Sequence, residues 1–254
     1  EAALSGAAML RAFGRGGADR WEEWAEQLRL RFRERFWVED EEGPYPAIAL
    51  GRDKQPLDAL TSNIGHLLGT GLIDDEESAL VAARLAGAHL DSGFGLRTLA
   101  DNSEGYSPLG YHIGTVWPHD TAIAVQGLVR AGHHAVAEPL AAGLVRASAS
   151  FDGRLPELFA GHGTRIDSRP APYPAACRPQ AWAAASAVAV LQAVLGLEAD
   201  APGGRLTVRP EMAVGYRPLE ASGLRLGEKE FSVKVDGEGT PQVTGLPDGF
   251  VKRA

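Results

Sequence analysis

The stretch Tyr111-His-Ile-Gly-Thr-Val-Trp-Pro-His-Asp120 marks the place where a loop turns into a helix. Thr115 is suited to cap that helix, Pro118 suits its first turn, and Asp120 places an acid where the helix dipole favours one. The apolar run Thr121–Ala131 follows directly. Because soluble proteins seldom gather so many polar and aromatic groups at one helix mouth for packing alone, this mouth is a candidate binding site.

Helical patterns extend outward from this stretch in both directions. Apolar residues recur at helical spacing along much of the chain, which predicts a mainly α fold of about eight helices. The clearest segments are 4–13, 19–36, 57–68, 76–85, 121–131, 135–148 and 181–195. Inner apolar helices alternate with outer amphipathic ones. The last of them, Ala181–Leu195, is apolar nearly all round, which predicts a buried helix.

The character of the chain changes near its C-terminus. From Arg205 onward, apolar and polar residues alternate in strand fashion, with Gly and Pro turns between the strands. We therefore expect a helical domain over residues 1–200 and a small antiparallel β appendage over residues 201–254. Val38–Pro56, by contrast, has no helical period and is predicted to be a loop, with room for a short strand around Ala47–Leu50.

Composition and charge exclude several classes of protein. The chain has 254 residues and a net charge of -8, with no basic stripe, so a nucleic-acid partner is not expected. Its one cysteine, Cys177, permits no intrachain disulfide, which favours a cytoplasmic protein. No apolar stretch is long enough to span a membrane. The first six residues, Glu1-Ala-Ala-Leu-Ser-Gly, resemble the middle of a helix, which predicts an N-terminal remainder as a partner.

Glu157 is the best candidate for a catalytic group. Glycoside hydrolysis uses two carboxylic groups, one as an acid and the other as a nucleophile or a base. Pro156 fixes the backbone before Glu157, apolar Leu155, Leu158 and Phe159 flank it, and an open polar loop follows. Such a frame tunes a carboxyl group for acid–base work; the alternative is a surface glutamate on a turn. Asp120 is the next candidate, with a helix-start role as its alternative.

Several other side chains are candidates for contact with a sugar. Tyr111, Trp117 and Trp182 are suited to stack on a sugar ring or, equally, to pack in the core. Arg178 and Gln180 would bind hydroxyl groups, hold Glu157, or face solvent. The remaining candidates for substrate binding are His112, His119, Asp120, Asn63 and His66. We expect no metal, because His112 and His119 lie seven residues apart without a third ligand, and no cofactor, because no glycine-rich phosphate loop is present.

Four segments resemble, in the same order, the C-terminal part of the amylo-α-1,6-glucosidase (glycogen debranching enzyme) family. They are Leu57-Asp-Ala-Leu-Thr-Ser-Asn-Ile-Gly-His-Leu-Leu, Tyr111-His-Ile-Gly-Thr-Val-Trp-Pro-His-Asp, Leu155-Pro-Glu-Leu-Phe-Ala-Gly and Tyr173-Pro-Ala-Ala-Cys-Arg-Pro-Gln-Ala-Trp-Ala-Ala. The resemblance implies an (α/α)6 toroid, present here in part. It also implies inversion of configuration, with Glu157 as general base and an Asp upstream of residue 1 as general acid, so that the isolated chain has little activity.

Three functions are consistent with these residues. The first is an inverting glycoside hydrolase that acts on α-glucosidic linkages, such as α-1,6 branches, of an oligosaccharide, a polysaccharide or a small glycoside. The second is a sugar epimerase or isomerase with His112 and His119 as its acid–base pair. The third is a carbohydrate-binding segment without catalytic activity.

Overall fold

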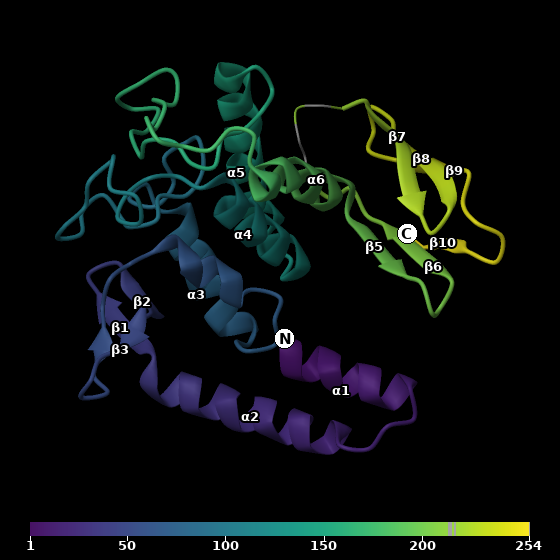
Figure 1. Ribbon diagram of the computed structural model, residues 1–254, viewed down its shortest axis with the longest axis horizontal. Coiled ribbons are helices and arrows are strands. Elements are labelled where there is room, and N and C mark those ends of the chain that lie inside the picture. Colours follow the sequence, from purple (N-terminus) through teal and green to yellow (C-terminus); the bar gives the residue numbers. More distant parts are fainter. Residues whose placement is uncertain (213–214, 216, 254) are drawn as a thin grey trace.

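The computed structural model describes residues 1–212, 215 and 217–253 (Figure 1). The α-helices are α1 Ala2–Ala12, α2 Ala18–Arg35, α3 Asp75–Ala86, α4 Pro118–Arg130, α5 His134–Ser148 and α6 Ala181–Leu195, with short 3-10 helices η1 Ser62–Leu67 and η2 Ala149–Phe151. The strands are β1 Trp37–Asp40, β2 Gly43–Pro46, β3 Ala49–Leu50, β4 Pro56–Leu57, β5 Leu197–Asp200, β6 Arg205–Val208, β7 Leu219–Leu226, β8 Lys229–Val235, β9 Pro241–Thr244 and β10 Val251–Arg253.

The expectation of a mainly α fold is wrong. The structure is 37% helix and 20% strand, and its strands form four small sheets. One of these sheets is the hairpin β1–β2, in the segment that was expected to be a loop. Its strands are four residues long and contain Pro44 and Pro46, so they show no alternating pattern that would predict a strand.

Helix α4 is the centre of the helical part. It contacts α5, α6 and η1, and its buried Val125 and Leu128 join the main hydrophobic core. The helix begins at Pro118 with Asp120 in its first turn, as predicted, but its cap residue is Trp117. Thr115, the predicted cap, instead donates its hydroxyl to the backbone oxygen of Tyr111, at 2.8 Å. The loop before α4 is therefore folded back on itself.

Helix α6 is only half buried, contrary to the prediction. Ala183, Ser186 and Val190 face the core, whereas Trp182 is 44% exposed and Val188 is 60% exposed. Because this helix consists almost entirely of Ala, Val and Leu, its sequence carries no polar stripe that would reveal the exposed face.

The C-terminal strands form two three-stranded sheets, in the orders β10-β6-β5 and β7-β8-β9. Phe231, Val233 and Leu206 lie in a second hydrophobic core, which Leu195 of α6 joins. The pairs are antiparallel except for β10 with β6, which is parallel. Strand β5 begins at Leu197, so β5 and β6 pair across the expected boundary at residue 200. The division into two domains stays a prediction.

The long loops are held together by isolated backbone bridges. Arg97 pairs with Val116, Val116 with Phe159, and Phe159 with Pro172. Figure 1 shows these loops on the side of α4 to α6 that is away from the C-terminal strands. The bridges place the segment before α4 beside the segment that carries Glu157, two residues before Phe159.

Gly161 lets these loops approach closely. A Cβ atom on Gly161 would lie 1.8 Å from the backbone oxygen of Gly114. The buried Arg97 then locks the arrangement, because its Nε donates to the Gly161 oxygen at 2.8 Å. The conformation around Glu157 thus depends on Gly161, which is close to it in sequence, and on Arg97, which is far from it in sequence.

Candidate active site

The carboxylate of Glu157 is buried and held by two donors. The Tyr111 hydroxyl donates to Oε1 at 3.1 Å, and the backbone N–H of Cys177 donates to Oε2 at 3.3 Å. The Glu157 backbone N–H in turn donates to the Cys177 oxygen at 2.9 Å. Glu157 is only 8% exposed, so it is not the surface glutamate of the alternative interpretation.

A series of packed aromatic side chains begins next to this carboxylate, at Tyr111. The Tyr111 ring packs edge-on against Trp117 at 5.0 Å, and Trp117 packs edge-on against Trp182 at 5.8 Å. His112 stacks on Trp117, and His119 stacks on Trp182 with ring centroids 4.3 Å apart. We call Tyr111, His112, Trp117, His119 and Trp182 the aromatic mouth.

A histidine–carboxylate pair lies beside the aromatic mouth. His66 Nε2 is 2.7 Å from Asp120 Oδ1. The other oxygen of Asp120 and the Nδ1 atom of His119 are buried without a partner among the described residues. Two polar atoms thus have unused hydrogen-bonding capacity at the N-terminus of α4, where a hydroxyl-bearing ligand would satisfy them.

Three of the other predicted residues form no hydrogen bond or ion pair with Glu157 in the described part of the chain. Arg178 pairs with Asp152 at 2.8 Å and does not hold Glu157. Asn63 is exposed and accepts a hydrogen bond from Thr61, and Gln180 precedes α6 without a side-chain cap bond. Of the three roles considered for Arg178, support of Glu157 is not seen, because Arg178 pairs with Asp152 and the backbone N–H of Cys177 contacts the Glu157 carboxylate. Its role in substrate binding stays a prediction.

Two contributors were missed in the sequence. Tyr173 packs against Tyr111 at 5.8 Å, and Cys177, expected to be a buried small residue, is exposed and acts through its backbone. Both lie in the fourth of the segments that carry the family resemblance, and this position was the sequence feature that could have marked them as site residues. Among the described residues, no three His, Cys, Asp or Glu side chains are grouped as a metal ion would require.

For the glycoside hydrolysis that the family resemblance implies, we predict that Tyr111→Phe lowers kcat about tenfold, because a hydrogen bond to a charged group is lost while the ring stays. Desolvation, and then the hydrogen bond to Glu157, raises the pKa of the Tyr111 phenol, so it is a stable donor at neutral pH. Steady-state kinetics test this expectation. Tyr173→Phe is the matched control, since the Tyr173 hydroxyl has no hydrogen bond to a described residue. Equal kcat values for the two variants would contradict the assignment.

We predict that His119 makes the chain less stable in acid. Burial lowers the pKa of His119 below its ordinary value, which outweighs the opposite effect of Asp120. The unfolded chain therefore takes up a proton at a pH where the folded chain resists it, and stability falls as pH drops through the ordinary range of histidine. Melting temperatures at about pH 7.5 and about pH 5 should differ more for the wild type than for His119→Phe. An equal decrease in both proteins would refute this role.

Comparison with known proteins places the chain among carbohydrate-active enzymes. A family model described as the mannosylglycerate hydrolase MGH1-like glycoside hydrolase domain matches residues 1–160. The chain belongs to this family. Membership agrees with the predicted glycoside hydrolase class, while the finer resemblance to debranching enzymes is not established by it. No curated protein matches the chain significantly.

Among solved structures, the MGH1-like domain is similar in fold to neutral trehalase Nth1 from Saccharomyces cerevisiae. The TM-score is 0.52 at 16% sequence identity, and the match covers 69% of this chain. The match covers 31% of the trehalase chain, so the chain corresponds to less than a third of that enzyme. In the part of the chain that the structure describes, no helix has both the length and the apolar character needed to cross a membrane.

Proposed function

We propose that this chain carries the general base and one wall of the sugar site of an inverting glycoside hydrolase that acts on α-glucosidic linkages. The observation that carries the proposal is the buried Glu157 carboxylate, held at both oxygens beside the aromatic mouth. Membership of a glycoside hydrolase domain family supports the reaction class.

Glu157 is suited to deprotonate a water molecule. Each of its oxygens accepts one hydrogen bond from the protein, and a carboxylate has about four acceptor positions, so positions remain for a water. The Tyr111 and Cys177 donors hold the carboxylate in one orientation, with the remaining acceptor positions available to the water. In an inverting mechanism this water attacks the sugar carbon while a second carboxylic acid protonates the leaving oxygen. That acid is, in this proposal, an Asp in a segment of the enzyme other than the four quoted above.

The aromatic mouth would bind the sugar ring. Tyr111 and Trp182 are partly exposed, which leaves ring surface for stacking, while Trp117 is buried and holds both in place. The unpartnered atoms of Asp120 and His119 would bind hydroxyl groups of the same sugar. His66 orients Asp120 for this contact. His112 is exposed, stacks on Trp117 and would extend the wall.

A substrate panel tests this proposal. The full-length protein, which carries the second carboxylic acid of this proposal, is incubated with isomaltose, a branched glucan, trehalose and mannosylglycerate, and the released sugars are followed by NMR. We expect release from an α-glucoside, with isomaltose and the branched glucan as the favoured pair. Release from mannosylglycerate alone would contradict the α-glucoside assignment and would leave the glycosidase class intact.

The same experiment separates the other two hypotheses. An epimerase or isomerase would convert a free sugar into its isomer without cleaving any glycoside. A carbohydrate-binding segment would bind the panel without turnover even within the full-length protein. Either result would contradict the proposed hydrolase.

A further inference from the structure

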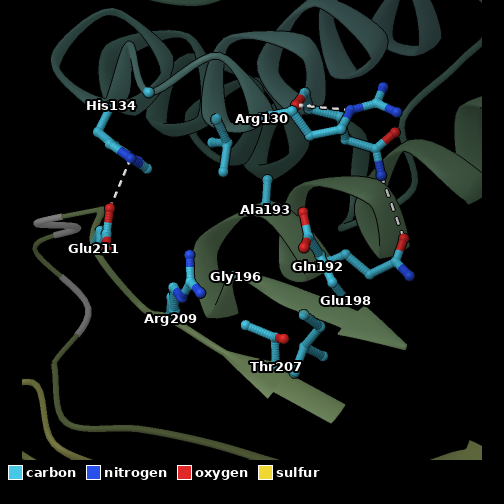
Figure 2. A pocket seen from close by; sticks show the side chains of 13 residues that line it. Arg130, His134, Gln192, Ala193, Gly196, Glu198, Thr207, Arg209 and Glu211 are labelled. Atoms are coloured by element: carbon cyan, nitrogen blue, oxygen red, sulfur yellow. Dashed lines mark hydrogen bonds and ion pairs between the residues drawn. The ribbon is translucent and has the colours of Figure 1, made fainter. Parts of the chain in front are cut away.

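A second hollow lies at the opposite ends of the helices that carry the aromatic mouth. It has a volume of about 420 Å³, within the size range of small-molecule sites. Its walls are the last turns of α4 and α6, the β5–β6 hairpin and the residues just after it (Figure 2). Trp117 caps α4 at one end and Arg130 ends it at the other, so the two sites lie roughly 20 Å apart.

Some of the side chains that line the hollow form hydrogen bonds or ion pairs with one another. His134 Nε2 pairs with Glu211 at 2.8 Å, and Gln126 donates to the Gln192 oxygen at 3.3 Å. Arg130 donates to the backbone oxygen of Gln126 at 3.4 Å. These contacts, drawn as dashed lines in Figure 2, hold the rim of the hollow in a defined shape.

The rest of the lining has unused hydrogen-bonding capacity. The side chains of Arg209, Glu198 and Thr207 form no hydrogen bond or ion pair with another residue that the structure describes, although all three line the hollow. Nδ1 of His134 is buried without a partner among those same residues. Figure 2 shows Arg209 reaching from the strand side toward the space beneath Ala193. Polar groups without a protein partner thus line one space, of which Arg209 and Glu198 are exposed to solvent and His134 Nδ1 is buried.

The balance of these groups indicates the class of ligand. Arg130 and Arg209 oppose Glu198 and Glu211, so the formal charges of the lining cancel if His134 is neutral. An anion would meet two carboxylates, and a cation would meet two guanidinium groups. A neutral molecule with several hydroxyl groups can donate to Glu198 and accept from Arg209 at once, since each hydroxyl is both donor and acceptor. We propose that this hollow is a second binding site, for a neutral sugar.

An NMR titration with maltose tests this site. The chain with Glu157→Gln is used, so that hydrolysis does not interfere, and the signals of Gly196 and the His134 imidazole are followed. We expect saturable shifts at both, and a dissociation constant that rises about tenfold in Arg209→Gln, because a charged donor is lost. Arg225→Gln, which alters an exposed arginine of β7, is the control and should leave the constant unchanged.

Three results would overturn the proposal. They are shifts that do not saturate, an unchanged constant in Arg209→Gln, and shifts caused by sodium sulfate but not by maltose, which would indicate an anion site. Should Arg209→Gln not fold, Glu198→Gln removes the opposing charge and must also weaken binding. Because the readout is binding at Gly196 and His134, its failure is independent of whether Glu157 acts as a base.

Discussion

Glu157→Gln should reduce the hydrolysis rate by about 10²–10⁴-fold, the range that a general base contributes. Gln has nearly the same shape, but its single oxygen accepts only one of the two hydrogen bonds that Tyr111 and Cys177 donate to separate oxygens of Glu157, and its amide cannot take a proton from water. The fold should persist, because the side chain keeps its volume. The initial rate on the preferred α-glucoside and the melting temperature measure the two effects separately.

Glu138→Gln is the matched control for this change. Glu138 lies on α5, within the helical part but with no ion pair to a described residue. The control should retain the wild-type rate. A Glu157→Gln enzyme within a factor of about three of the wild type, with an intact fold, would exclude Glu157 as the base.

Gly161→Ala should unfold or severely loosen the loops around the candidate active site. The added methyl group would lie 1.8 Å from the Gly114 oxygen, so one backbone segment has to move. Gly161 also accepts hydrogen bonds from Arg97 at 2.8 Å and from the Tyr106 hydroxyl at 3.1 Å, and this movement would stretch both. We expect a loss of about 3 kcal/mol in the free energy of unfolding. Hydrolysis should fall as well, because Phe159 anchors the segment that carries Glu157.

Thermal unfolding followed by circular dichroism measures this loss. The melting temperature should drop by about 6–12 °C for a domain of this size. Gly16→Ala is the control, since a Cβ atom there meets nothing within 4 Å and the backbone is not left-handed. If the two variants melt at the same temperature, close packing at Gly161 does not hold the loops.

The parts of the fold that local sequence determines were predictable. Asp74 begins α3 with a capping box to Glu77, and Pro118 and Asp120 mark the start of α4. These signals work because the partner groups lie within one helical turn. The hairpin β1–β2 was missed because its strands are only four residues long and β2 contains two prolines, which are uncommon in strands.

The residues that form the candidate site could be predicted from the sequence, but the hydrogen bonds that hold Glu157 could not. Glu157, Tyr111, Trp117 and Trp182 were all candidates, and the structure brings them together. The support of Glu157 was not fully predictable, because one of its two donors is the backbone N–H of Cys177, twenty residues away, and a backbone N–H leaves no mark in a sequence. The exposed face of α6 was missed for a related reason, since burial depends on neighbours that a uniform apolar pattern does not specify.

The most direct test of Glu157 as an inverting base uses α-glucosyl fluoride. Fluoride leaves without protonation by an acid, so the reaction depends on the activation of water alone. NMR during the first minutes reports the configuration of the glucose that is formed. We expect β-glucose as the first product, with fluoride release lost in Glu157→Gln. First formation of α-glucose, or release that Glu157→Gln does not change, would contradict this expectation.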